Sequence, residues 1–531
     1  MSQISVGGVP YGLRHELDRK AVPTVRSAPF DAEAVAREDA ERAAKHLLES
    51  YGRVLPVNAD LASTGLWTDL PNGDRLWRLR VASDGALATE LYFEELFLPS
   101  GGTMHVYDDA GGQVLGGFTS ANNAASGLFS TALIDGASCF VEYYEPQAVQ
   151  GQGHFRITGV GHTYRSSSGL AAADACEVDV NCSEGADWTA QRDGVVRVGT
   201  REGNIIGWCS GALVNNVRED CRPFILTANH CGENSTATDL AQWKFYFKYE
   251  RPGCGTGQAL IGRSLTGCDL RGSSNDAGGD SGSDFLLLEA RNDVPTAWGA
   301  YWCGWDATGT GSTGGKCIHH PMGSEKKIST YTGTTSSSSY GGAVPNTHWR
   351  VTWAATANGH GVTEGGSSGS PLFNSAHRII GTLTGGSSSC TNVNGPDSYG
   401  KMSYHWQSDP GPVNQRLKYW LDPQGSGRLS MDGSYDPCGL TGISEQAAIA
   451  APNVYPNPAA EDLTIELPRT GDRVERIDVR DLTGRLVKSV RVGTTERASL
   501  DVRGWSEGLY VIELISAKGP AGTARFAVTY P

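Results

Sequence analysis

The sequence predicts a mostly β protein with three parts: an α+β domain at the N-terminus, one or two β-barrels in the middle and a small β-sandwich at the C-terminus. Glycine is heavily used, with 69 of 531 residues, and charged residues make up only 19% of the chain. Short runs of alternating apolar and polar residues recur along most of its length. This combination is typical of β-rich proteins with many turns rather than of helical bundles.

The bulk properties exclude several classes of protein. The net charge is −14 and no basic run compensates for it, so we expect no nucleic-acid partner. No apolar run approaches the length of a transmembrane segment. Residues 1–30 lack the apolar core of a signal peptide, so we expect either a signal removed ahead of Met1 or a new methionine placed there.

Cysteine usage points to an exported protein. Ten of the twelve cysteines fall between Cys176 and Cys390, and they do not form the paired CxxC knuckles of zinc sites. Disulfides explain them better than metal does, and disulfides persist in oxidising compartments. We therefore expect neither a metal nor a cofactor.

Residues 1–167 form the predicted N-terminal domain, which holds no cluster of catalytic side chains. One helix is expected over residues 31–51, with Asp31 as its cap and apolar positions every three or four residues up to Leu47 and Tyr51. Strands are expected afterwards, with the turn at residues 110–112 joining two of them into a hairpin. Their ranges are 75–81, 88–98, 103–109, 113–119 and 140–146.

Two further domains are expected after the Ser- and Ala-rich linker at residues 164–176. Residues 168–437 hold most of the cysteines and many short β-runs, which favours barrels. A linker at residues 438–450 leads to residues 451–531, whose short alternating runs predict a small β-sandwich. Its predicted strands are 475–481, 486–492, 497–502, 509–515 and 524–530.

The motif LTANHC contains the first candidate catalytic residue, His230. An apolar run leads into it, and Cys231 follows directly. A buried histidine capped by a disulfide would explain the motif equally well if it stood alone. Cys209 lies upstream, in WCSGALVNN, and a Cys209–Cys231 bridge would fix the imidazole and contribute about 3 kcal/mol.

A general-base histidine needs a carboxylate on its second ring nitrogen. The aspartates at positions 269, 276 and 280 lie in Gly-, Ser- and Asn-rich turns, whereas Asp284 begins the apolar run DFLLLE. A carboxylate at the edge of such a strand is partly buried and needs a partner. Asp284 is the candidate, and its alternative role is that of a cap at the start of the strand.

The segment GGSSGSP supplies the candidate nucleophile, Ser368. Its glycines permit a sharp turn, so the N–H groups of Gly366 and Ser368 can point where the serine hydroxyl reacts, as an oxyanion hole requires. The order along the chain is His230, Asp284, Ser368, which is the order found in chymotrypsin-like enzymes.

Seven motifs in the right order resemble bacterial lysyl endopeptidases, which are trypsin-like serine proteases of two β-barrels. They are CSGALVNN, LTANHC, SDFLLLE, GWD, IHHP, TEGGSSGSP and GGSSSC, and the resemblance covers about residues 172–433. It implies a catalytic triad of His230, Asp284 and Ser368. It also implies three disulfides, which are Cys176–Cys390, Cys182–Cys254 and Cys209–Cys231. In this family the IHHP block is structural, so His319 and His320 are not expected to bind zinc.

The two flanking domains resemble known companions of such enzymes. Residues 1–167 resemble the propeptides that precede bacterial proteases of this kind. The C-terminal domain resembles a type A sorting domain of type IX secretion in the motifs YPNP, DLTGRLV and GLYVIEL, although its final residues lack the usual basic ending. The resemblance implies a secreted or cell-surface zymogen that uses the secretion machinery. We expect a monomer that acts on proteins or peptides.

The specificity pocket departs from that of trypsin, because Val362 stands six residues before Ser368 and only Glu364 lies nearer. The resemblance places the selective carboxylate at Asp397 in PDSYGK, where a buried charge selects a basic side chain before the cut bond. Without the resemblance, the motif PDSYG favours a turn in which Asp397 is a turn aspartate. A His–Trp pair that borders the site in some relatives is replaced by Thr384 and Tyr340, which favours relaxed specificity.

Three alternatives therefore stay open: a strict lysyl enzyme, an enzyme that prefers arginine or accepts both, and an inactive cell-surface binding protein, which the intact triad disfavours. Ser367 replaces the aspartate that would receive a new N-terminus, so activation is expected through removal of a covering domain. The linker contains Arg165 but no lysine, and no lysine occurs between Lys45 and Lys244. Either the enzyme matures itself after Arg165 or another protease does so.

The remaining cysteines are assigned less fully. Cys303 and Cys317 are expected to pair locally. The partners of the others stay open; these are Cys139, Cys221, Cys268 and Cys438.

Overall fold

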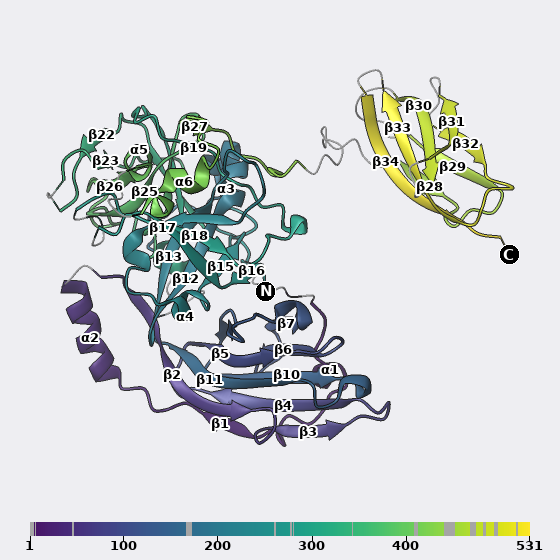
Figure 1. Ribbon diagram of the computed structural model, residues 1–531, viewed down its shortest axis with the longest axis horizontal. Coiled ribbons are helices and arrows are strands. Elements are labelled where there is room, and N and C mark those ends of the chain that lie inside the picture. The colour runs from purple at the N-terminus through teal and green to yellow at the C-terminus, as the bar shows by residue number, and fades with distance from the viewer. Residues whose placement is uncertain are drawn as a thin grey trace. The chain divides into compact units, whose positions relative to one another are not determined.

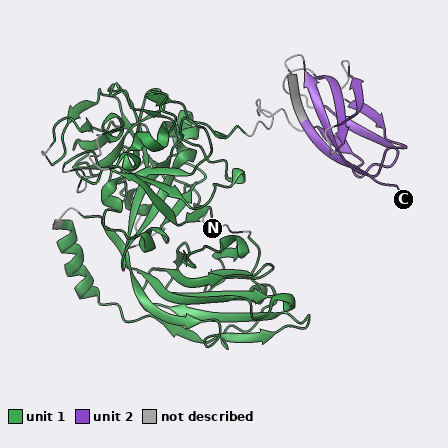
Figure 2. Ribbon diagram, in the orientation of Figure 1, with its two compact units in different colours: residues 1–439 green, residues 440–531 purple. Residues whose placement is uncertain are grey.

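The computed structural model forms two compact units, residues 1–439 and residues 440–531, coloured separately in Figure 2. Within the residues it describes, no helix is long and apolar enough to cross a membrane. The predicted linker at 438–450 falls outside them from residue 440 onward. The described residues are 5, 7–44, 47–165, 173–259, 262–276, 279, 281–341, 344–407, 412–439, 452–467, 474–481, 485–492, 497–516 and 519–530.

The N-terminal part consists of two facing β-sheets and one longer helix (Figure 1). One sheet has the strand order β1-β4-β10-β6-β7, with β3 beside β4, and the other sheet contains β2, β11, β5 and β8. The helices are α1 (Tyr11–Arg14) and α2 (Ala32–Ala44). The strands are β1 (Thr24–Arg26), β2 (Ser50–Asp60), β3 (Leu66–Asp69), β4 (Arg75–Ala82), β5 (Ala88–Phe97), β6 (Thr103–Asp108), β7 (Val114–Phe118), β8 (Phe129–Ser130), β9 (Ile134–Asp135), β10 (Ser138–Glu145) and β11 (His154–Thr163).

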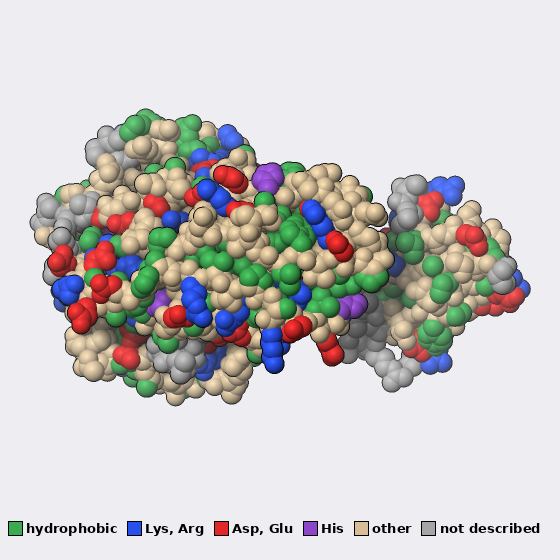
Figure 3. Space-filling model, turned by 90° about the horizontal axis from the view of Figure 1, so that it is seen from below, with side chains coloured by type: hydrophobic (Ala, Val, Ile, Leu, Met, Phe, Trp, Pro, Cys, Tyr) green, Lys and Arg blue, Asp and Glu red, His purple; other side chains and the backbone are tan. Residues whose placement is uncertain are grey.

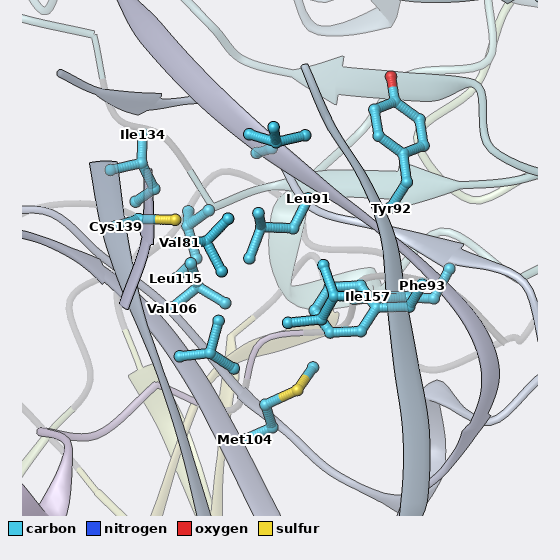
Figure 4. Packing of buried hydrophobic residues seen from close by; sticks show 14 of the residues in the cluster. Val81, Leu91, Tyr92, Phe93, Met104, Val106, Leu115, Ile134, Cys139 and Ile157 are labelled. Carbon is cyan, nitrogen blue, oxygen red and sulfur yellow. The ribbon is translucent and has the colours of Figure 1, made fainter. Parts of the chain in front are cut away.

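The core of this part lies between the two sheets, as Figure 4 shows. Val81 and Val106 come from one sheet, whereas Leu91, Phe93 and Ile157 come from the other, and all five are fully buried. Alternate residues of each strand point inward, which is why the alternating runs predicted these strands. The predicted hairpin at residues 110–112 is confirmed, since β6 and β7 pair antiparallel.

The predicted helix over residues 31–51 is partly wrong. Its start is confirmed, because the Ala34 N–H donates to the Asp31 carboxylate at 2.9 Å. However, α2 ends at Ala44, and Ser50 begins strand β2. Tyr51 is 2% exposed and stacks on Trp208 at 4.2 Å between ring centroids. Strands on both sides pair with β2, and this tertiary pairing outweighs the local helical periodicity.

Strands of the N-terminal and middle parts share one sheet. In the path β16-β15-β12-β13-β2-β11-β5-β8, β2 of the N-terminal part pairs with β13 of the middle part. The elements of the middle part's first half are α3 (Thr189–Gly194), β12 (Val195–Glu202), β13 (Ile205–Leu213), β14 (Phe224–Thr227), α4 (Ala237–Leu240), β15 (Lys244–Phe247), β16 (Ser264–Thr266), β17 (Cys268–Ser273) and β18 (Leu286–Ala290).

A separate nine-stranded sheet forms the second half of the middle part. Each half surrounds an apolar cluster of its own, which includes Val198 and Leu288 in the first half and Leu372 and Tyr399 in the second. The elements of the second half are β19 (Trp305–Asp306), β20 (Gly315–His319), β21 (Lys327–Tyr331), β22 (Ser336–Ser338), β23 (His348–Val351), β24 (Pro371–Asn374), β25 (Ile379–Gly386), β26 (Asp397–Lys401), α5 (Met402–His405), α6 (Leu417–Leu421) and β27 (Ser430–Met431). The predicted fold class, mostly β with two separate sheets in the middle part, is confirmed.

The C-terminal unit is a β-sandwich of a three-stranded and a four-stranded sheet, as predicted. Fully buried residues from both sheets, including Leu463, Ile477 and Ile512, form its core. Its strands are β28 (Asn453–Tyr455), β29 (Asp462–Glu466), β30 (Val474–Asp481), β31 (Leu486–Arg491), β32 (Arg497–Asp501), β33 (Gly508–Ser516) and β34 (Gly519–Val528).

Four disulfides are present, and three of them are those that the resemblance implied: Cys176–Cys390, Cys182–Cys254 and Cys209–Cys231. The fourth joins Cys221 to Cys438. The expected pairing of Cys303 with Cys317 is wrong, because both are buried free thiols that pack in different apolar clusters. Cys139 and Cys268 are also free and buried.

Charged side chains of both signs are scattered over the face of the molecule seen in Figure 3. Basic side chains alternate there with acidic ones. This mixed pattern agrees with a chain that has 44 basic and 58 acidic residues.

Candidate active site

His230 and Asp284 lie side by side because the strands next to them pair. His230 follows β14 and Asp284 precedes β18, and these strands are antiparallel with Thr227 opposite Leu286. His230 Nδ1 lies 2.7 Å from Asp284 Oδ2, and the backbone N–H of His230 donates to Asp284 Oδ1 at 2.9 Å. Two bonds to one carboxylate fix both the ring and its loop. The Nδ1–H tautomer leaves Nε2 free to accept a proton.

The electrostatics of this pair suit a general base. Burial by itself lowers the pKa of His230, but the charge and hydrogen bond of Asp284 outweigh burial and raise that pKa above its usual value. The Asp284 side chain is completely buried. A buried carboxylate that accepts two hydrogen bonds stabilises the imidazolium that forms when His230 takes a proton.

Asp276 supports Asp284, a role that the sequence did not reveal. Its Oδ2 accepts the backbone N–H of Asp284 at 2.8 Å, and its Oδ1 accepts the Ser274 hydroxyl at 2.7 Å. Asp284 has φ +60°, a conformation that is uncommon for residues other than glycine. The bond from Asp276 holds the backbone in this conformation. Of the other aspartates considered, Asp269 forms ion pairs with Arg291 and Arg271, and residue 280 lies outside the described residues.

Hydrogen bonds from Ser210 of β13 hold the loop that carries Ser368. The Ser210 N–H donates to the Ser368 carbonyl at 2.8 Å, and the Ser210 hydroxyl donates to the Gly366 carbonyl at 2.9 Å. Gly366 has φ +85°, and a Cβ there would lie 3.0 Å from backbone atoms of residues 320, 322 and 323. The position therefore requires glycine.

The N–H groups of Gly366 and Ser368 donate to no other group among the described residues. The carbonyls of both residues accept hydrogen bonds from Ser210, which anchors the backbone of this loop to β13. Two uncommitted N–H groups next to a serine are what an oxyanion hole needs.

The Cys209–Cys231 disulfide joins the histidine loop to β13. Cys231 is the residue after His230, and its sulfur lies 3.9 Å from the Ser368 carbonyl oxygen. The predicted histidine and serine loops therefore meet at this bridge. The structure brings His230, Asp284 and the Ser368 loop together.

Asp397 lies at the start of β26 and is fully buried. Its Oδ2 accepts the Trp353 Nε1–H at 2.6 Å, the Thr363 hydroxyl at 2.7 Å and the Ser388 hydroxyl at 2.6 Å. All three donors are neutral, and none of the ion pairs in the described part of the chain includes Asp397. Burial raises the pKa of Asp397, although these hydrogen bonds oppose the change.

The other acidic candidate, Glu364, has a different environment. Burial and the neighbouring Asp174 carboxyl raise the pKa of Glu364 to about 7. Val362, at the position of the trypsin-type selective residue, is fully buried in an apolar cluster. It therefore offers no charge to a substrate.

Thr384 and Tyr340, the positions that depart from the lysyl enzymes, both lie beside His348. The Thr384 hydroxyl is hydrogen bonded to His348 Nε2 at 3.0 Å, and the Tyr340 ring centroid lies 5.6 Å from that of His348. Burial lowers the pKa of His348 to about 4. Sequence reasoning missed His348, because its partner Thr384 lies on a strand that is distant along the chain.

The IHHP histidines are packed inside the protein. His319 Nδ1 lies 2.8 Å from the Ser367 hydroxyl, and His319 Nε2 lies 3.1 Å from the Ser329 hydroxyl. His320 Nδ1 is hydrogen bonded to the Ser324 carbonyl at 2.9 Å. Burial lowers the pKa of His319 to about 3 and also lowers that of His320. His319 therefore positions Ser367, the residue before the candidate nucleophile.

Two family models match the chain. Residues 170–400 match the model described as lysyl endopeptidase, C-terminal domain, and residues 453–528 match the secretion system C-terminal sorting domain. A curated relative is the lysyl endopeptidase of Pseudomonas aeruginosa. It is 28% identical over 349 residues, covering 61% of this chain and 71% of the relative.

Solved structures of proteases are also similar. Protease Anisep from Arthrobacter nicotinovorans is 17% identical with a TM-score of 0.30, covering 40% of this chain and 91% of that chain. The thermostable serine protease AL20 from an extremophilic microorganism is 14% identical with a TM-score of 0.29, covering 42% of this chain and 100% of that chain.

Proposed function

We propose that this chain, a secreted or cell-surface serine endopeptidase with a lysyl endopeptidase domain and a secretion-sorting domain, cleaves peptide bonds after basic residues, with lysine preferred. The observation that carries this proposal is the complete burial of the Asp397 carboxylate. A fully buried carboxylate whose donors among the described residues are all neutral is costly unless a ligand supplies the opposite charge. A lysine ammonium before the cut bond would supply it.

The proposed reaction uses His230, Asp284 and Ser368 as a catalytic triad. The Ser368 hydroxyl attacks the carbonyl carbon and gives its proton to Nε2 of His230, while Asp284 holds the ring and stabilises the cation. The oxyanion that forms accepts hydrogen bonds from the N–H groups of Gly366 and Ser368. His230 then returns the proton to the leaving amine, and water cleaves the acyl-enzyme by the reverse sequence of proton transfers.

The N-terminal domain is proposed to act as a propeptide that is removed on activation. The division at residue 167 follows the resemblance, since the shared sheet joins both parts in the intact chain. Arg165 is held within the N-terminal domain, where its guanidinium donates to Asp39 at 2.9 Å and to Glu49 at 2.8 Å. A protease that cuts after Arg165 must first release it from these carboxylates.

An enzyme that accepts arginine as well is the second candidate. The absence of lysine from the linker and the presence of Arg165 favour it, provided that the enzyme matures itself. Thr384 and Tyr340 in place of a His–Trp pair also favour it. The wild type and Ser368→Ala can be expressed side by side and their new N-termini sequenced. A wild type that begins at Ser166, with the variant uncut, would support arginine acceptance.

Digestion of a denatured protein, followed by sequencing of every cut site, tests the proposed function directly. The proposal expects cuts after lysine, with arginine sites slower or absent, and no cuts by Ser368→Ala. Cuts without regard to the preceding residue would refute the specificity. A processed protein that neither cuts nor reacts with a fluorophosphonate at Ser368 would instead support the inactive binding protein.

A further inference from the structure

Strand β2 of the N-terminal domain continues the sheet of the catalytic domain up to the active site. It pairs antiparallel with β13, with Arg53 opposite Ile205 and Ser50 opposite Gly207. Three residues beyond Gly207, the Ser210 N–H binds the Ser368 carbonyl. The chain that leads into β2, from Leu48 to Ser50, therefore lies next to the nucleophile loop.

Leu48 fills an apolar depression of the catalytic domain next to β13. It is 8% exposed and belongs to the cluster that contains Cys209 and Cys231. Its Cδ2 atom would lie 2.8 Å from a Cβ placed on Gly207, so the absence of a side chain at Gly207 makes room for it. Gly207 stands two residues before Cys209, whose disulfide to Cys231 anchors the histidine loop, so the depression lies along the part of β13 that leads to the active site.

Glu49 lies against the oxyanion loop. A Cβ on Gly365, the residue before Gly366, would come 2.3 Å from the Glu49 carboxylate. Glu49, Ser50 and Arg165 line a small cavity together with Trp208, Gly365 and Gly366. Arg165 of the same domain neutralises the charge of Glu49, at a distance of 2.8 Å. The presence of Glu49 next to Gly365 therefore does not indicate that this part of the catalytic domain prefers an acidic side chain.

The position of Asp397 indicates which side of Ser368 these contacts occupy. A substrate whose basic side chain points toward Asp397, at the start of β26, lies on the side of Ser368 where Thr363 and Ser388 bind that carboxylate. The residues after the cut bond must then leave Ser368 on the other side. To that side we assign Gly365, which Glu49 lies against, and the part of β13 next to Leu48, which packs in the apolar cluster that contains the Cys209–Cys231 bridge.

We propose that Leu48–Ser50 occupy the leaving-group subsites of the protease in an extended, substrate-like manner, and that the depression filled by Leu48 selects an aliphatic side chain among the first two residues after the cut bond. The proposal rests on the proposed function, because it assigns subsites to the same active site. It has two consequences. The mature enzyme prefers leucine at one of these positions, and the intact chain excludes substrates that extend past the cut bond.

The first test uses the mature enzyme and peptides with lysine before the cut bond. Leucine, aspartate or glycine is placed in turn at each of the first two positions after it. We expect kcat/KM to be at least about 10-fold higher for leucine than for aspartate or glycine at one position, the range that a hydrophobic subsite gives. Equal values at both positions, in an enzyme that does cut after lysine, would overturn the inference and leave the proposed function standing.

The second test uses the intact chain, with its mass verified before and after the assay. Lysine p-nitroanilide, which has no residue after the cut bond, is compared with a peptide that extends four residues past it. We expect Leu48→Asp to raise hydrolysis of the long peptide at least about 10-fold. A charged side chain is costly to bury in an apolar depression, so the introduced aspartate should move out of it and free the subsite for the peptide. Hydrolysis of the anilide should change less.

Two matched variants control the second test. Leu48→Met keeps an apolar chain of similar volume and should behave like the wild type. Leu87→Asp introduces the same charge at a leucine of the N-terminal domain that is 45% exposed, and it should also leave the long peptide excluded. Equal hydrolysis of the long peptide by the wild type, Leu48→Asp and Leu48→Met would overturn the inference. Failure of every chain to hydrolyse either substrate, mature enzyme included, would refute the proposed function itself.

Discussion

Glu90→Gln is expected to loosen the N-terminal domain from the catalytic domain. Glu90 lies on β5 of the former and Lys244 on β15 of the latter, with Lys244 Nζ 2.7 Å from Glu90 Oε1. Both side chains are buried, with 1% of Lys244 and none of Glu90 exposed. Glutamine keeps the size of the side chain but leaves the Lys244 ammonium buried without an opposite charge.

The loss of binding free energy between the two domains can be estimated from the burial of this ion pair. Breaking a buried ion pair by removing one partner costs about 3–5 kcal/mol. At about 1.4 kcal/mol for each factor of ten, the domains should bind about 10²- to 10⁴-fold more weakly. The hydroxyl of Tyr92, 3.3 Å from Lys244 Nζ, remains as a neutral partner and favours the lower end of this range.

The assay uses the Ser368→Ala chain, so that no further cleavage occurs, nicked in the linker by an added protease. Dissociation of the two fragments is followed by native mass spectrometry over a dilution series. Glu94→Gln is the control on the same strand, because its partner Arg156 is 42% exposed, and exposed pairs contribute about 0–1 kcal/mol. If Glu90→Gln and Glu94→Gln weaken binding equally, the buried pair does not hold the domains together. A Glu90→Gln, Lys244→Met double variant should recover part of the affinity.

Three further outcomes are expected. Ser368→Ala should lower kcat by about 10⁶-fold while the chain still folds, whereas Ser367→Ala should retain activity; the reverse result would reassign the nucleophile. Asp397→Asn should lower kcat/KM for lysine substrates by about 10²-fold or more and change neutral substrates little, and equal losses would place specificity elsewhere. His230 must be neutral to act as a base, so kcat/KM should fall as the pH drops through its raised pKa. Asp284→Asn should move that acid limb to lower pH and lower kcat by about 10⁴-fold, and an unmoved limb would contradict the pairing.

The sequence allowed prediction of those features that depend on local patterns. The strands of the N-terminal domain alternate apolar and polar residues because one face of each packs against the opposite sheet, so their ranges were predictable. His230 and Asp284 could be singled out because one follows an apolar strand run and the other precedes one. The pairing of those two strands is what brings the side chains together.

Features that depend on distant partners were not predictable. Asp276 has the same Gly- and Ser-rich surroundings as the other turn aspartates, and only the folded chain shows its bond to the backbone of Asp284. Tyr51 continues a helical period, but its stacking on Trp208 decides its conformation. Cys303 and Cys317 are close in sequence, yet each packs in a different apolar cluster.

Arg165 and Leu48–Ser50 together constrain how the first activation cut is made. For a chain to cut itself after Arg165, the guanidinium must leave Asp39 and Glu49 and enter the pocket of Asp397. The residues after Arg165 must then lie on the leaving-group side of Ser368, which Leu48 and Glu49 are proposed to occupy in the intact chain. The residues after Arg165 can enter that side only if Leu48–Ser50 leave it. If activation proceeds by a cut after Arg165, this proposed occupancy disfavours a first cut within the same molecule and favours one made by a second, already active protease molecule.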